Sequence, residues 1–98
     1  MRVIARKAIV EFYLKHSDAR TALEEWYEKT QDADWDSLAD VKQMFNSADY
    51  VGNDRIVFNI KGNQYRLVAL VLYKIKRVYI RFVGTHQEYD RIKEIENI

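Results

Sequence analysis

The chain has 98 residues, of which 48% are hydrophobic and 32% are charged, a composition typical of one folded domain and not of a disordered segment. It contains no cysteine, which excludes disulfides, thiolate metal sites and a cysteine nucleophile. Its charge is uneven: residues 1–50 hold 7 Lys/Arg and 10 Asp/Glu, whereas residues 51–98 hold 9 and 5. No apolar run is long enough to cross a bilayer, so we expect a cytoplasmic protein without a membrane segment.

Three helices are predicted in the first half of the chain, where apolar residues recur at helical spacing. The first should cover about residues 8–16. The second should cover residues 19–27, with Ser17 or Asp18 as its N-cap. The third is short, at residues 38–45, and follows an acidic loop.

The second half alternates with a period of two, which is typical of strands. Residues 55–60, 64–73 and 78–83 are rich in β-branched and aromatic side chains, and turn signals separate them. They predict an antiparallel meander. The expected fold class is α+β, with about three helices packed on one face of a twisted antiparallel sheet and a short C-terminal helix, all in one domain of residues 1–98.

The side chains also predict the register of the meander, because cross-strand partners must point to the same face. A two-residue turn in the first hairpin places Asn59 opposite Arg66. A two-residue turn in the second places Leu70 opposite Arg81 and adds Phe82 to a fully apolar face, which the helices should cover.

The opposite face gathers cations. Between Arg55 and Gln87 there are seven basic residues and no acidic one. The register collects part of this charge on one surface that holds Arg55, Asn59, Arg66 and Arg81. Such a surface suits a polyanion, although an ordinary solvated face of an antiparallel sheet is the alternative.

A compact polar stretch follows the last predicted strand. Thr85 and Glu88 have the spacing of a capping box and predict a helix start. His86, Tyr89 and Asp90 then lie along one side of that helix. Because His86 follows directly from the strand that carries an arginine, it is a candidate general base.

Arginines, a histidine and a tyrosine together suit the cleavage of RNA. The RNA supplies its own 2′-hydroxyl as nucleophile, so the protein need provide only a base, an acid and cations for the developing charge. His86 would act as base or acid, while Arg66 and Arg81 would stabilise the phosphate. Tyr79 and Tyr89 could stack on splayed bases. We expect no metal site and no cofactor.

Two patterns carry a resemblance to a known family. They are N-I-x-G-N-x-x-R at residues 59–66 and Y-I-R-x-V-x-T-H-x-E-Y-D at residues 79–90. Over essentially its whole length the chain resembles the HigB toxins of bacterial type II toxin-antitoxin modules, within the RelE/ParE superfamily. This resemblance implies a RelE-like fold and an mRNA endonuclease that acts on the ribosome. It also implies silencing by a cognate helix-turn-helix antitoxin in a hetero-oligomer.

The resemblance and the predicted face together nominate the site residues. The candidates for catalysis are Arg66, Arg81, His86 and Tyr89. The candidates for RNA binding are Arg55, Asn59, Lys61, Lys76, Arg77 and Tyr79. The competing hypothesis is a toxin or module without enzymatic activity, such as a ParE-like gyrase inhibitor or an RNA- or protein-binding domain that uses the same basic face.

Overall fold

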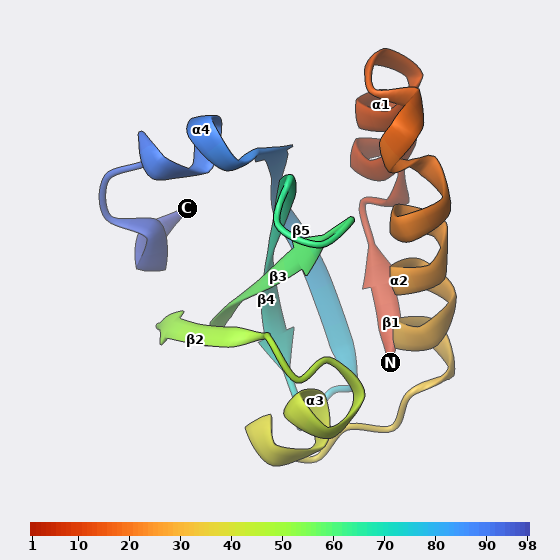
Figure 1. Ribbon diagram of the computed structural model, residues 1–98. Helices are drawn as coiled ribbons and strands as arrows, with labels where there is room; N and C mark the ends of the chain where they lie inside the picture. The colour runs from red at the N-terminus through yellow and green to blue at the C-terminus, as the bar shows by residue number, and fades with distance from the viewer.

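The computed structural model describes residues 1–98 (Figure 1). Its elements, in chain order, are β1 (Arg2–Ile4), α1 (Arg6–Lys15), the 3-10 turn η1 (Ser17–Ala19), α2 (Arg20–Asp32), α3 (Leu38–Met44), β2 (Asp49–Gly52), β3 (Arg55–Ile60), β4 (Tyr65–Leu72), β5 (Arg77–Thr85), α4 (His86–Asp90) and the 3-10 turn η2 (Ile95–Asn97). No helix is both long and apolar enough to cross a membrane.

The strands form one five-stranded sheet in the order β1-β5-β4-β3-β2. The α+β class is confirmed, but the prediction of a purely antiparallel sheet is wrong, because β1 pairs with β5 in parallel. Its three residues are too few to display a period of two, so local pattern could not identify them as a strand. β2, which pairs antiparallel with β3, was not predicted either.

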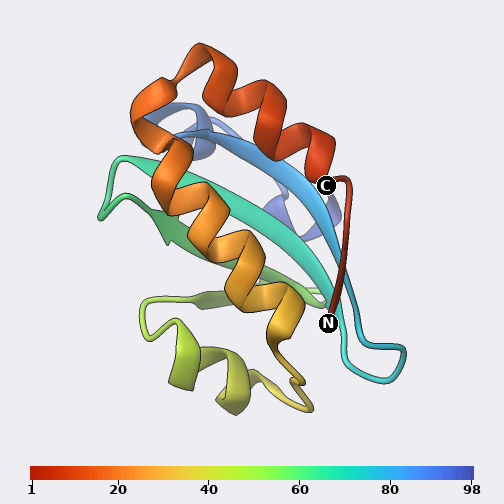
Figure 2. The same cartoon turned by 90° about the vertical axis from the view of Figure 1, so that its right-hand side faces the viewer.

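The helices do not all lie over the same part of the sheet. α1 and α2 cover one face, and α3 lies at its lower end (Figures 1 and 2). α4 and η2 lie on the side opposite α1 and α2 (Figure 1). The packing of three helices on one face is therefore not confirmed in that detail.

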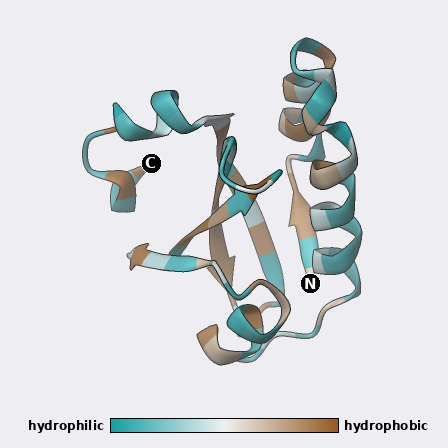
Figure 3. Cartoon of the chain, viewed as in Figure 1, coloured by the Kyte–Doolittle hydropathy of each residue, from teal (hydrophilic) through white to brown (hydrophobic).

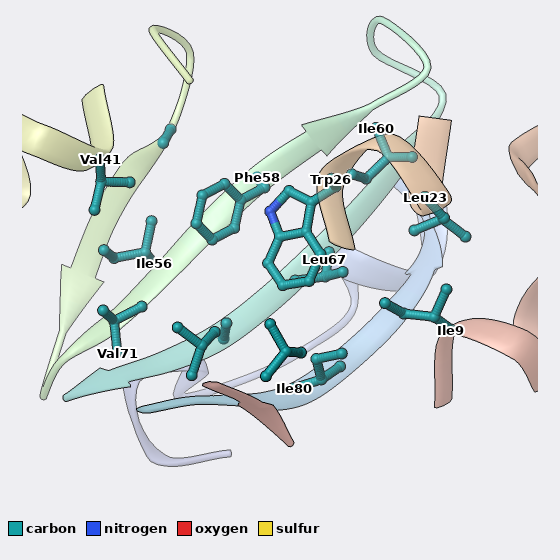
Figure 4. Packing of buried hydrophobic residues seen from close by; sticks show 14 of the residues in the cluster. Ile9, Leu23, Trp26, Val41, Ile56, Phe58, Ile60, Leu67, Val71 and Ile80 are labelled. Atoms are coloured by element: carbon teal, nitrogen blue, oxygen red, sulfur yellow. The ribbon is translucent and has the colours of Figure 1, made fainter. Parts of the chain in front are cut away.

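The main core lies between the sheet and the helices. Trp26 from α2 packs its ring against Phe58 from β3 at a centroid distance of 5.3 Å (Figure 4). Val41 from α3 belongs to the same buried cluster, so α3 closes the core at its end (Figure 4). In Figure 3 the central strands are mostly brown, whereas α4 is teal. Burial of this apolar surface is the main stabilising contribution to the fold.

The first hairpin has the predicted register, with Asn59 opposite Arg66. The second does not, because Leu70 lies opposite Tyr79 instead of Arg81. The connection between β4 and β5 covers residues 73–76 and is longer than the predicted two-residue turn. The register therefore shifts by two residues at that end of the hairpin, which leaves the alternation of faces unchanged.

A β-bulge in β5 then inverts that alternation. Val68 pairs with Phe82 and Ala69 with Ile80, so Arg81 is the extra residue. Beyond the bulge Val83 packs against the core and Phe82 lies on the opposite face, which contradicts the prediction for Phe82. The bulge thus brings an aromatic ring to the same face as the arginines.

Helix starts were predicted with mixed success. The capping box of α4 is confirmed: Glu88 N–H donates to Thr85 Oγ1 at 3.1 Å, and Thr85 N–H donates to Glu88 Oε1 at 2.8 Å. In contrast, no side chain caps α2, because η1 precedes it. The Asp18 carboxylate accepts a hydrogen bond from the Tyr65 hydroxyl at 2.7 Å and so joins η1 to the sheet.

Candidate active site

The candidate site lies on the face of the sheet opposite α1 and α2, which we call the arginine face because it carries Arg55, Arg66 and Arg81. This face is not simply solvated. Val57 and Val68 lie on it by register and are buried, yet neither belongs to the main core cluster. The segment of α4 and η2 lies on this side of the sheet (Figure 1) and shields it from water.

Arg66 is held rigidly and is only 9% exposed. Its Nη1 donates to the carbonyl oxygens of Asn63 and Tyr65 at 3.1 and 3.2 Å, and its Nη2 donates to Asn63 Oδ1 at 2.7 Å. Its Cζ lies 6.0 Å from the centre of the Tyr89 ring. No carboxylate forms an ion pair with it, so a buried guanidinium keeps its charge against neutral oxygens and an aromatic ring.

Tyr89 lies between Arg66 and the ring of Phe82, which the bulge places on this face. Its ring centroid is 6.5 Å from that of Phe82. Burial raises the pKa of the Tyr89 hydroxyl above its usual value, and the charge of Arg66 opposes that rise. At neutral pH the hydroxyl is therefore protonated and can donate. Gly84 allows this packing, because a Cβ at that position would collide with the Phe82 ring.

His86 is the first residue of α4 and is oriented by Asp90 one turn later. Its Nδ1 lies 2.7 Å from Asp90 Oδ2. An imidazole that donates through Nδ1 leaves Nε2 free as an acceptor, which is the arrangement of a base and its orienting carboxylate. His86 also lines a surface hollow with Asn63, whose side chain holds Arg66.

The other two arginines converge on a single oxygen. Arg55 Nε and Nη2 lie 3.1 and 2.8 Å from the main-chain oxygen of Ile98, and Arg81 Nε lies 3.0 Å from the same atom. Arg55 Nη1 also donates to the Asn53 carbonyl at 2.9 Å. Neither guanidinium has an Asp or Glu partner.

A protein-family model of HigB_toxin, described as the RelE-like toxic component of a toxin-antitoxin system, matches residues 19–92. The chain belongs to this HigB toxin family. The mRNA interferase toxin HigB of Escherichia coli is 34% identical over 93 residues, which cover 92% of this chain and 88% of that protein. The mRNA interferase HigB of Shigella flexneri has the same identity and coverage, and one from another E. coli strain is 23% identical over 94 residues, or 94% and 91% of the two chains.

The four candidates for catalysis in this HigB family member form two groups. Arg66 contacts Tyr89, and Asn63 links this pair to the hollow beside His86. Arg81 is paired with Arg55 instead, and no hydrogen bond joins it to His86. The expected convergence of all four side chains therefore stays a prediction. A contact joins only Arg66 to Tyr89, and no contact joins Arg81 to the other three.

The remaining candidates for RNA binding differ in whether their side chains are already paired with other groups of the protein. Lys61 forms an ion pair with Asp18 at 2.9 Å. Lys76 forms ion pairs with two aspartates at 2.9 and 2.5 Å, and it donates to a main-chain carbonyl at 2.9 Å. Asn59 is exposed, and the Arg77 guanidinium lies 3.5 Å from the Tyr79 hydroxyl at the start of β5. Their RNA-binding roles stay predictions.

Two residues of the site were not among the predicted ones. Asp90 orients His86, and its spacing of four residues on a helix was the available signal. Asn63 fixes Arg66 from a turn, and its signal was its place in the N-I-x-G-N-x-x-R pattern. No cluster of three or more His, Asp or Glu side chains is placed to hold a metal ion.

Proposed function

We propose that residues 1–98 form one toxin domain that cleaves mRNA on the ribosome and thereby inhibits translation. The observation that carries this proposal is the family match, supported by relatives named mRNA interferases. The arrangement of the arginine face supports it independently. Three arginines without Asp or Glu partners lie on the face that α4 borders, and α4 carries a histidine and a tyrosine.

The arginines supply the positive charge that phosphodiester cleavage requires. Charge on the phosphate oxygens increases as the 2′-oxygen attacks phosphorus, and fixed cations stabilise that transition state more than the ground state. Arg66 suits this role because its position is already set by Asn63 and the Tyr89 ring. Arg81 contributes a second guanidinium from the bulge of β5.

His86 and Tyr89 supply the proton transfers. Nε2 of His86 takes the proton from the 2′-hydroxyl, and the 2′-oxygen forms a bond to phosphorus as the bond to the 5′-oxygen breaks. The products are a 2′,3′-cyclic phosphate and a 5′-hydroxyl, whose proton comes from the hydroxyl of Tyr89. Asp90 holds the imidazole in orientation and stabilises the imidazolium that forms.

RNA binding then extends from the reacting phosphate along the sheet. Asn59 lies across from Arg66 and can donate to the next phosphate or to a base. Tyr79 and Arg77 can contact a base and a phosphate farther along β5. Lys61 and Lys76 are secondary contributors, since an RNA phosphate would have to compete with the carboxylates that already hold them.

The same proposal includes a partner and a compartment. A toxin of this family requires a cognate antitoxin, which we propose to be a helix-turn-helix protein that binds the toxin in a hetero-oligomer. The target, translated mRNA, places the reaction in the cytoplasm. The chemistry requires no cofactor and no metal ion, because the RNA provides the nucleophile.

The decisive test is expression without the antitoxin, followed by mapping of the ends of cellular mRNA. The parent should arrest growth and fragment translated messages. His86→Ala should slow cleavage by roughly 10²–10⁴-fold, the usual contribution of a general base. Arg81→Ala should also slow it, whereas Lys7→Ala, which removes an exposed cation on α1, should not.

Two results would contradict the nuclease. Intact mRNA together with supercoiling defects would indicate a gyrase inhibitor. Folded His86→Ala protein that cleaves as fast as the parent would remove His86 from the mechanism. Asp90→Asn should reduce cleavage less than His86→Ala, because it removes the carboxylate charge and leaves the imidazole in place.

A further inference from the structure

The segment that follows α4 returns across the sheet and ends against two arginines of the arginine face. Three N–H groups, two from Arg55 and one from Arg81, converge on the main-chain oxygen of Ile98 at 2.8 to 3.1 Å. These residues lie 43 and 17 positions from Ile98, so the contact is tertiary. The two guanidiniums thus form one site for one oxygen.

The chemistry of this site exceeds what its present occupant offers. One oxygen atom can accept few hydrogen bonds, whereas the site presents three donors and two positive charges. A phosphate would bring a formal negative charge and further oxygens, and guanidinium groups bind phosphate with paired N–H bonds. The Ile98 oxygen therefore stands where a phosphate oxygen would bind.

The segment has only two other hydrogen bonds to the sheet side, both of them exposed, and Ile95, Glu96 and Ile98 are half-buried. Asn53 Nδ2 donates to the Glu96 carbonyl at 3.3 Å and to Asn97 Oδ1 at 3.2 Å. Gly52 lies so close that an added Cβ would be 3.2 Å from Glu96 Cβ. Side-chain hydrogen bonds at the surface contribute little net stability, so this segment can leave the sheet without unfolding the core.

We propose that Arg55 and Arg81 form a binding site for a backbone phosphate of the RNA, and that residues 94–98 occupy this site in the free protein and are displaced by RNA. This inference rests on the proposed function and adds its regulation. The apparent affinity for RNA is then the intrinsic affinity reduced by the fraction of molecules whose segment is open. Residues 94–98 therefore compete with RNA for Arg55 and Arg81.

A reversible crosslink can close the site. The chain has no cysteine of its own, so Gly52→Cys combined with Glu96→Cys gives one possible disulfide. The Cβ separation of 3.2 Å is a few tenths of an ångström below the usual range for disulfides, which a small shift of the segment can supply. Gly52 has a φ of +104°, so the substitution strains the backbone, but the reduced form of the same protein carries the same strain and is the matched control.

The probe is a short 2′-O-methyl RNA, which cannot be cleaved, and its binding is measured by fluorescence anisotropy. The oxidised protein should bind at least about tenfold more weakly than the reduced protein, because it has almost no open fraction. Asn53→Gly should shift affinity the other way and tighten binding by about two- to fivefold. Glycine suits the positive φ of 47° at this position, so only the amide contacts are lost.

The control for the opening variant is Asn46→Gly, the same exchange in the exposed turn after α3, which should not change binding. Equal affinity in the oxidised and reduced forms would overturn the proposal, and so would no binding by either form. Failure of the proposed nuclease function would be a separate result. It would appear as intact mRNA in the expression test, whereas this binding test uses an RNA that cannot be cleaved.

Discussion

Cations that contact the helical half of the chain and cations on the arginine face have different partners. Arg6 of α1 pairs with Glu24 of α2 at 2.9 Å, and Lys76, from the connection between β4 and β5, pairs with two aspartates that precede α3. On the arginine face Arg66 contacts only neutral oxygens and an aromatic ring. The first arrangement joins parts of the fold, whereas the second leaves positive charge for a ligand.

The difference has a physical consequence for binding. An RNA phosphate that approached Lys76 would have to displace a carboxylate of equal charge, with little net gain. A phosphate that approaches Arg66 replaces a neutral carbonyl or amide oxygen, and it adds an ionic attraction to a guanidinium that has no Asp or Glu partner. The total charge of the chain, +1, conceals this separation.

The largest expected effect is on the helix-covered face and concerns stability alone. Phe58 is buried and lies 5.3 Å from Trp26 and 5.3 Å from Phe45 between ring centroids. Phe58→Ala should lower the free energy of unfolding by about 3–5 kcal/mol through lost transfer energy and a residual cavity. Urea denaturation followed by circular dichroism measures it.

Phe58→Ala should not change the cleavage activity of the molecules that remain folded. Cleavage per folded molecule should equal that of the parent, because Phe58 lies on the face away from the arginines. A large loss of activity in fully folded Phe58→Ala protein would show that the two faces are not independent.

Arg66 tests the other face, where the main effect should be on catalysis. Arg66→Ala should reduce cleavage by about 10²–10³-fold, as expected for a preorganised group that stabilises developing charge. Arg66→Lys keeps the charge but lacks the fork that Asn63 holds with two hydrogen bonds, so it should recover only part of the activity. Cleavage of a translated message in a reconstituted system measures both.

Because Arg66 is buried, its loss also leaves polar groups unpaired, and the folded fraction must be measured beside the rate. If folded Arg66→Ala protein cleaved at the parental rate, the charge of Arg66 would not contribute to catalysis.

A smaller effect is expected at the helix that carries His86. Thr85→Ala removes one half of the capping box of α4 and should cost about 1 kcal/mol of local helix stability. Because α4 is only five residues long, activity should fall more than the global unfolding midpoint does. Glu88→Gln preserves a capping box and is the control. An unchanged rate in Thr85→Ala would show that α4 does not need its cap to position His86.

Local pattern predicted the parts of the molecule that local physics determines. The capping box at Thr85 and Glu88 joins residues three positions apart, and the hairpin register at Asn59 and Arg66 follows from a short turn and the alternation of faces. The positions of Arg55 and Arg66 on one face were therefore predictable, whereas the register predicted for Arg81 was wrong. The roles of these arginines in catalysis remain predictions.

Long-range contacts account for what was missed. Parallel pairing of β1 with β5 joins Val3 to Val78, and no local signal records such a partner. The bulge at Arg81 depends on an extra residue that periodicity alone does not reveal, and it reversed the predicted face of Phe82. The return of the final segment to Arg55 is likewise tertiary, so it could only be found in the structure.

The smallest expected effect concerns the ion pair that ties η1 to the first hairpin. The Tyr65 hydroxyl and then the Lys61 ammonium lower the pKa of the Asp18 carboxyl, because both favour its ionised form. A carboxyl whose pKa is lower in the folded state adds stability above its unfolded pKa of about 3.9, and that stability is lost as the pH falls through the folded pKa. Asp18→Asn should therefore shift the urea midpoint downward at pH 7, and the gap from the parent should shrink near pH 3. A gap of equal size at both pH values would mean that the charge of Asp18 does not stabilise the fold. Lys7→Ala, which removes an ion pair within α1, is the control. Its urea midpoint should change between pH 7 and pH 3 by about as much as that of the parent.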